Sequence, residues 1–328
     1  MRHRSGTVAK RMLTLLAGGG LLIASSLVAS PAGAIGQLSQ AEILSSLSRA
    51  GVFDSAIASA THDQGTTSAS LTGDESVTLP AYANGSISVT NSSSSPSSQI
   101  DIGLPTGTSS SAGVEIAPSS TLYSLADYSV AATITTSGVR ESLTLNNSSA
   151  PSTYSYPVTL SPGEFLATNP DGSISVMQSF SGGSVSVGTF LAPWATDAQG
   201  KPVATNYTVQ GSTLVQHVDA TSATAFPVVA DPYWVQVGSD GSIDLRLTQK
   251  EQIFWYNASA TEITGLIAAV CFVVATVGCI VIGATGTALV VGALSLINVD
   301  GICPSTDYCN FFKGFYPWDG VVTSCIPY

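Results

Sequence analysis

The chain has 328 residues, of which only 9% are charged and 44% are hydrophobic, and its mean hydropathy is +0.33. A typical soluble domain carries about 25% charged residues, so Ser, Thr, Gly and Asn replace much of the usual charged surface. The chain is too apolar for a disordered acidic protein. Its 10 basic residues against 21 acidic ones give a net charge of −11, which argues against a nucleic-acid binder.

The first 34 residues have the three parts of a secretory signal peptide. A basic stretch ends at Arg11, an apolar run interrupted by Gly18–Gly20 follows, and Ala32-Gly33-Ala34 offers a small-residue cleavage site. An uncleaved membrane anchor is the alternative, which the glycines and the cleavage site disfavour. We expect a secreted protein that begins at Ile35, with 6 basic residues left against 21 acidic ones.

Residues 35–76 read as a short helical segment followed by a linker. Ser39 and Glu42 form a capping box, and Gly51 is a C-cap signal. The polar stretch THDQGTTSASLTGDES that follows predicts the linker.

Residues 77–237 read as a β-rich module, because short runs of Val, Ile, Leu, Thr and Tyr alternate with turn clusters. Asn84-Gly85, Asp171-Gly172 and Asp240-Gly241 each precede a strand-like run and supply the positive φ angles of tight turns. No helical pattern separates the strands. We therefore predict a mainly β fold, with an antiparallel β-sandwich-like module between a short N-terminal helix and a separate C-terminal module.

Three segments within residues 149–234 carry a sequence signature: SAPSTYSYPVTLSPGE, LAPWATDAQGKPVATNYTVQGSTLVQHV and AFPVVADPYW. Together they resemble a module of functionally uncharacterised secreted proteins of actinobacteria. In those proteins a β-rich region closes with a PVVADP motif, and a variable C-terminal domain with cysteines follows. The resemblance implies no known chemistry, but it implies a domain boundary at Asp231-Pro232.

Residues 238–328 read as an apolar, helical C-terminal module. Thr248 and Glu251 form a second capping box, and residues 263–297 contain no charge. A single helix of that length would measure about 53 Å, more than the ~30 Å of a bilayer core. One membrane span over residues 263–282 is therefore one solution, and a helical hairpin that turns near Gly283 is the other.

Small residues spaced by four would let such helices pack closely. They are Cys271, Ala275, Cys279 and Gly283 in one stripe, and Ala284, Ala288 and Gly292 in another. The alternative is that this run is the core of a small disulfide-bonded domain.

All five cysteines lie in the last 58 residues, which predicts a separate disulfide-stapled module. Cys271 and Cys279 would lie about 12 Å apart on a helix, too far to pair with each other. We expect two bridges that each link the apolar run to the tail, with Cys303 and Cys325 as the other candidates. Cys309 is then the odd thiol. A zinc site is disfavoured, because the module has no CxxC spacing and no histidine.

Motifs of catalysis are missing from the sequence: there is no GxSxG elbow, no P-loop and no dinucleotide GxGxxG after a strand. His62 falls in the predicted linker and His217 in a predicted strand, so neither suggests a catalytic base. The carboxylates that could form a glycosidase pair are Glu164, Asp197, Asp219 and Asp231, although such residues beside strands are usually turn formers. We expect no enzyme, no cofactor and no metal.

The leading hypothesis is a secreted, non-enzymatic protein whose β-rich module carries an apolar C-terminal domain that acts at a membrane, as bacteriocin-like or toxin-like proteins do. The alternative is a cell-surface binding or structural module, in which residues 263–297 form a core or a membrane anchor. A lipid membrane or a cell-surface component is the expected partner, not nucleic acid. The sequence leaves the oligomeric state open.

Overall fold

The computed structural model describes residues 37–71, 75–91, 98–236, 243–259, 261–262, 265–266, 303, 307–313 and 321–327. The predicted signal peptide lies outside these residues, and so do nearly all of residues 263–297. The predictions for Cys271, Ala275, Cys279, Gly283, Ala284, Ala288 and Gly292 therefore also lie outside them, as does the side chain of Cys309.

The predicted N-terminal helix is confirmed as α1 (Gln40–Arg49). The Ser39 hydroxyl accepts from the Glu42 amide at 3.3 Å, and the Glu42 carboxylate accepts from the Ser39 amide at 2.8 Å, which closes the capping box. Ile43 and Leu47 are buried in a cluster with residues of the second sheet such as Leu122. Burial of this apolar stripe is what fixes a helix of only ten residues, which is too short to be stable alone.

The predicted linker is wrong over most of its length, because it forms a hairpin. β1 (Thr61–Asp63) pairs with β2 (Thr66–Ser70) through a turn in which Gln64 and Gly65 have φ angles of 48° and 87°. All three residues of β1 are exposed. The hairpin extends the edge of a sheet, where strands can be polar on both faces and leave no hydrophobic alternation in the sequence.

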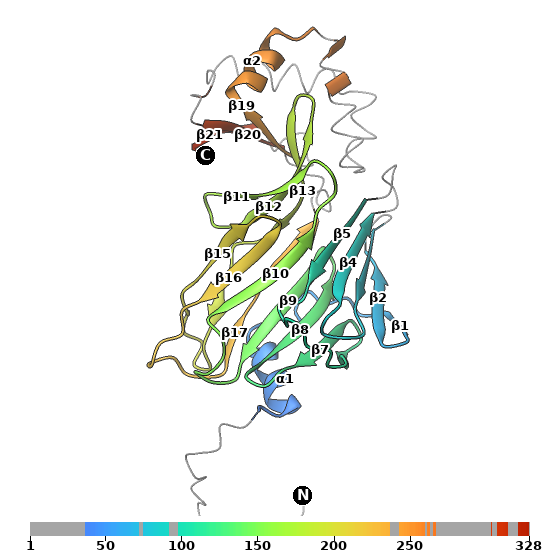
Figure 1. Ribbon diagram of the computed structural model, residues 1–328, viewed down its shortest axis with the longest axis vertical. Coiled ribbons are helices and arrows are strands. Elements are labelled where there is room, and N and C mark those ends of the chain that lie inside the picture. The colour runs from blue at the N-terminus through green and yellow to red at the C-terminus, as the bar shows by residue number, and fades with distance from the viewer. Residues whose placement is uncertain are drawn as a thin grey trace, which may run out of the picture. The chain divides into compact units, whose positions relative to one another are not determined.

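The first antiparallel sheet has eight strands in the order β1-β2-β3-β4-β5-β10-β16-β15 (Figure 1). The bounds of the strands not yet given are β3 (Glu75–Leu79), β4 (Ser86–Asn91), β5 (Ser98–Gly103), β10 (Thr153–Thr159), β15 (Thr205–Gln210) and β16 (Thr213–Val218).

The second sheet has 13 strands and is also antiparallel, with the main path β21-β20-β19-β13-β18-β9-β8-β7-β6. Off this path, β11 pairs with β12, β12 with β13, and β17 with both β14 and β9. The bounds are β6 (Val114–Ala117), β7 (Ser120–Ser124), β8 (Tyr128–Thr135), β9 (Gly138–Leu145), β11 (Glu164–Thr168), β12 (Ile174–Phe180), β13 (Gly183–Phe190), β14 (Ala195–Thr196), β17 (Val228–Ala230), β18 (Tyr233–Gln236), β19 (Ile243–Thr248), β20 (Asp307–Lys313) and β21 (Val321–Pro327).

The two sheets share one hydrophobic core, so the mainly β, sandwich-like prediction is confirmed at this level. Ile87, Ile102 and Tyr156 of the first sheet lie in the same buried cluster as Leu143 and Trp234 of the second. Burial alternates strictly along β10, where every second residue is buried and those between are exposed. The sequence alternation therefore reports the face of the strand that meets the core.

The described C-terminal residues do not confirm a separate helical module. They include the helix α2 (Gln249–Asn257) and three strands, and β19 pairs with β13 of the β-rich part. The described residues from Gln37 onward belong to one compact unit. The sequence signal for β19 is the alternation in IDLRLT, which is typical of strands. The capping box at Thr248 and the uncharged run of residues 263–297 favour helices instead.

Candidate functional site

The helix α2 exposes three apolar side chains while it buries one polar residue and one tryptophan. Gln252 and Trp255 are its buried residues, whereas Ile253, Phe254 and Tyr256 are 43%, 43% and 52% exposed. A surface helix normally buries its apolar stripe. Residues 258–262 separate the end of α2 from the uncharged run that begins at residue 263.

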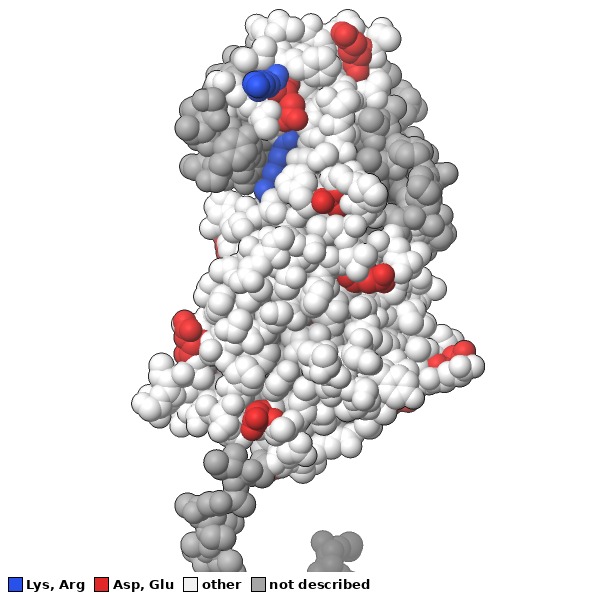
Figure 2. All heavy atoms as spheres, in the orientation of Figure 1, with Lys and Arg blue, Asp and Glu red and all other residues white. Residues whose placement is uncertain are grey.

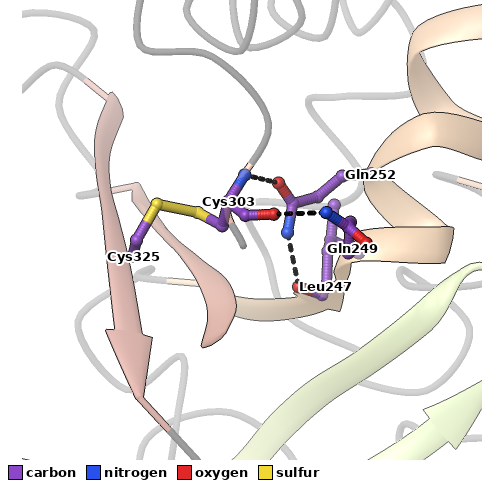
Figure 3. The surroundings of a disulfide bond; sticks show 5 residues. All are labelled: Leu247, Gln249, Gln252, Cys303 and Cys325. Atoms are coloured by element: carbon purple, nitrogen blue, oxygen red, sulfur yellow. Dashed lines mark hydrogen bonds between the residues drawn. A yellow bond between two sulfur atoms is a disulfide. The ribbon is translucent and has the colours of Figure 1, made fainter. Parts of the chain in front are cut away.

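Hydrogen bonds to Cys303 explain why glutamines point inward. The Gln252 Oε1 accepts from the Cys303 amide at 2.9 Å, and its Nε2 donates to the Leu247 carbonyl at 3.1 Å (Figure 3). Gln249 Nε2 donates to the Cys303 carbonyl at 3.1 Å. Both backbone groups of Cys303 are thus held by α2, and the buried amide of Gln252 is satisfied at both ends.

Cys303 also forms a disulfide with Cys325 of β21, with a Cα–Cα distance of 5.6 Å. The expectation that each of these cysteines pairs with the apolar run is therefore wrong. β20 and β21 form a hairpin, which brings Cys325 back toward α2. The pairing of these two strands therefore decides that Cys303 is the partner of Cys325. The pairing of Cys271 and Cys279 and the state of Cys309 remain predictions.

A second contact ties α2 to the β-rich part at Gly182, in the turn between β12 and β13. The Trp255 Nε1 donates to the Gly182 carbonyl at 2.6 Å. A Cβ at Gly182 would lie 2.5 Å from the end of the Leu266 side chain and 3.1 Å from Trp255 Nε1, so the absence of a side chain there makes room for both. The inner side of α2 is therefore fixed, and its outer side holds Ile253, Phe254 and Tyr256.

The face of the molecule in Figure 2 carries few charged side chains, which lie scattered among uncharged ones. This agrees with the low charge content of the chain. Within the described parts, none of the helices is both long and apolar enough to span a bilayer.

A buried cluster of charged and polar groups surrounds Asp231, between β17 and β18. Arg140 Nε lies 3.6 Å from Asp231 Oδ2, and the guanidinium carbon lies 4.5 Å from the centre of the Tyr233 ring. Asp231 is 2% exposed. Burial raises its pKa to about 7, against the lowering effects of the Arg140 charge and of hydrogen bonds with Trp194.

The backbone carbonyl of Asp231 accepts two hydrogen bonds from buried side chains. Tyr207 Oη donates at 3.2 Å and Gln216 Nε2 at 2.8 Å. Tyr156 Oη donates to Gln216 Oε1 at 3.2 Å, which fixes the orientation of the amide. Two residues of the first sheet, Tyr207 and Gln216, thereby bond one peptide group of the second.

Glu141 of β9 is the second buried carboxyl of this region, at 2% exposure. Burial raises its pKa well above the usual range, and its Oε2 has no hydrogen-bond partner among the described residues. The Glu141 amide donates to the Pro232 carbonyl at 2.9 Å. Burial is the main cause that raises the pKa of Tyr156 and of Tyr207, and the charge of Glu141 adds to it in both cases.

Of the four carboxylates named from the sequence, Asp231 alone belongs to this cluster. Asp197 accepts from the amides of Gln199 and Lys201 at 2.8 and 2.9 Å, which lowers its pKa and shapes a turn. Glu164 Oε2 accepts from the Ser161 amide at 2.7 Å, and burial raises its pKa. Asp219 is exposed.

The two histidines do not join this cluster either. His62 lies 3.6 Å from Glu115, and His217 lies within hydrogen-bond distance of Thr153 and Thr208 on the first sheet. Among the described residues, no group of three or more His, Cys, Asp and Glu is placed to hold a metal ion.

Sequence reasoning missed Arg140, Glu141, Tyr207 and Gln216. One signal was present: Val139, Glu141, Leu143 and Leu145 are spaced by two, so Glu141 occupies an inward position of an otherwise apolar strand face. Comparison with known proteins adds no identification, since no protein-family model and no curated protein matches this chain.

Proposed function

We propose that this chain is a secreted, non-enzymatic protein whose β-rich part carries a C-terminal segment that acts at a lipid membrane, in the manner of bacteriocin-like or toxin-like proteins. The observation that carries the proposal is the exposed apolar surface of α2. Its three exposed apolar side chains, Ile253, Phe254 and Tyr256, lie within the ten residues that precede the uncharged run of residues 263–297.

The chemistry of this surface favours uncharged lipid. The chain has a net charge of −11, so anionic headgroups would repel it. Insertion of apolar side chains into the interface is driven by the hydrophobic effect, which salt does not screen. We expect binding to neutral phosphatidylcholine vesicles that changes little between low and high salt.

The test is co-flotation of the full chain with such vesicles. The variant Ile253→Ser/Phe254→Ser removes two exposed side chains from α2. The matched control is Phe165→Ser/Leu191→Ser, because Phe165 and Leu191 are each 41% exposed but lie in the β-rich part. The α2 variant loses the transfer of two apolar side chains from water into the lipid, which should weaken its free energy of vesicle binding by about 2 kcal/mol. That corresponds to a partition coefficient ~30-fold lower than the wild type's.

The proposal requires that the wild-type chain floats with the vesicles, that the α2 variant binds more weakly, and that the control variant binds as the wild type does. Release of an encapsulated dye then separates action on the membrane from binding alone. Absence of flotation, or equal losses in both variants, would refute it. Binding to cell-wall glycan without flotation would favour the alternative, a cell-surface binding module.

A further inference from the structure

The sequence contains a single Asp-Pro pair, Asp231-Pro232, and it joins two strands. Before it, β17 pairs with β9 and β14; after it, β18 pairs with β9 and β13. Proline provides a tertiary amide without an N–H, so its nitrogen leaves more readily than an ordinary amide nitrogen once it is protonated.

The carbonyl of this peptide bond is polarised by two donors from another sheet. Tyr207 Oη and Gln216 Nε2 lie 3.2 and 2.8 Å from the Asp231 carbonyl oxygen. Tyr207 is 8% exposed and Gln216 is fully buried. Two preorganised donors in a water-poor environment are the arrangement that stabilises an oxyanion when a nucleophile adds to a carbonyl.

The nucleophile is the side chain of the same aspartate. Its carboxyl is buried, with Arg140 Nε 3.6 Å from Oδ2, and the Asp231 amide donates to the Trp194 carbonyl at 3.3 Å. The side chain and the amide of Asp231 are thus both held by contacts. An attacking group held next to its target gains a large effective concentration over a free one.

We infer that the folded chain cleaves its own Asp231-Pro232 peptide bond. The carboxyl oxygen of Asp231 adds to its own carbonyl carbon, and a C–O bond forms in a five-membered ring. The C–N bond to Pro232 then breaks, and the carboxyl proton moves to the prolyl nitrogen. Water opens the resulting cyclic anhydride to two carboxyl groups, so one water molecule is consumed for each bond cleaved.

The reaction uses the protonated carboxyl, which supplies both the nucleophile and the proton. Burial raises the pKa of Asp231 to about 7, so a large fraction is protonated in mildly acidic solution. The other titratable and charged groups that act on this site are Arg140 and Glu141 of β9, Tyr156 of β10 and Tyr207 of β15. We expect the rate to fall as the pH rises above 7.

Cleavage would leave the fold in place, because β17 and β18 each keep their pairing with β9. The covalent link between the N-terminal part and the segment that contains α2 would be lost. The two pieces would separate only when the β-ladder opens. This inference goes beyond the proposed membrane function and does not depend on it.

The test is a time course with the purified full chain at pH 5.5 to 8, followed by a denaturing gel, intact-mass measurement and N-terminal sequencing. The expected result is a fragment that begins at Pro232 and forms faster at pH 5.5 than at pH 8. Asp231→Ala should abolish it. Tyr207→Phe should slow it about 10²-fold, as removal of an oxyanion donor does.

Tyr154→Phe is the matched control, because the buried Tyr154 hydroxyl has no hydrogen-bond partner among the described residues. It should cleave at the wild-type rate. A second comparison uses wild-type protein in denaturant at the same pH, which needs no variant to fold. The inference is overturned when no fragment begins at Pro232, when folded and denatured chains cleave equally fast, or when the two tyrosine variants behave alike.

Discussion

Replacement of Glu141 by Gln should make the protein more stable at neutral pH. Glu141 is 2% exposed, burial raises its pKa well above the usual range, and its Oε2 has no hydrogen-bond partner among the described residues. In the folded protein the carboxyl therefore stays protonated at pH values where the unfolded chain ionises it. Gln has nearly the same shape and is neutral at every pH, so it removes this difference between the two states.

The magnitude follows from proton linkage. Because the folded state keeps the proton and the unfolded state releases it near the ordinary pKa of 4.5, the free energy of unfolding falls as the pH rises above that value. The loss is about 1.4 kcal/mol per pH unit as long as the carboxyl stays protonated in the folded state. Relative to the wild type, Glu141→Gln should thus gain little at pH 4.5, and its advantage should grow with pH at a slope of up to about 1.4 kcal/mol per pH unit.

The assay is unfolding by urea, followed by tryptophan fluorescence at several pH values between 4.5 and 6.5. Burial also raises the pKa values of Glu75 and Asp231, but these contributions are common to both proteins and cancel in the difference. The exposed Glu115→Gln serves as control, with an expected change within about 0.5 kcal/mol. A Glu141→Gln effect that does not grow with pH, or a variant less stable than the wild type at pH 6.5, would refute the reasoning.

Three further predictions concern packing, the disulfide and processing. Gly188→Ala would place a Cβ 1.9 Å from the Trp234 ring, so we expect a loss of about 3 kcal/mol in urea unfolding. Cys303→Ser and Cys325→Ser each open the same disulfide, whose sequence separation of 22 makes it worth roughly 3 kcal/mol of stability. Both variants should therefore speed tryptic cleavage near α2 to the same extent, and unequal effects would contradict a shared disulfide. N-terminal sequencing of protein from the culture medium should begin at Ile35, and a start at Met1 would exclude signal-peptide cleavage.

The sequence by itself determined the features that depend on neighbouring residues. Both capping boxes form where the spacing of Ser39 and Thr248 from their glutamates predicts them. The Asp171-Gly172 turn precedes β12, and Gly172 has the positive φ angle of 85° that the pattern predicts. Alternation along β10 identifies its buried face. These features are local, because a cap, a turn or a strand face is set within a few residues of the chain.

Only the tertiary structure decided which distant residues meet. The pairing of β19 with β13 joins the C-terminal strands to the β-rich part, and the β20–β21 hairpin brings Cys325 to Cys303. Burial likewise gives Asp231 its raised pKa and places its carbonyl against Tyr207. Strand order, disulfide partners and desolvation depend on which pairing of distant segments has the lowest free energy for the whole chain. Patterns among neighbouring residues do not predict that pairing.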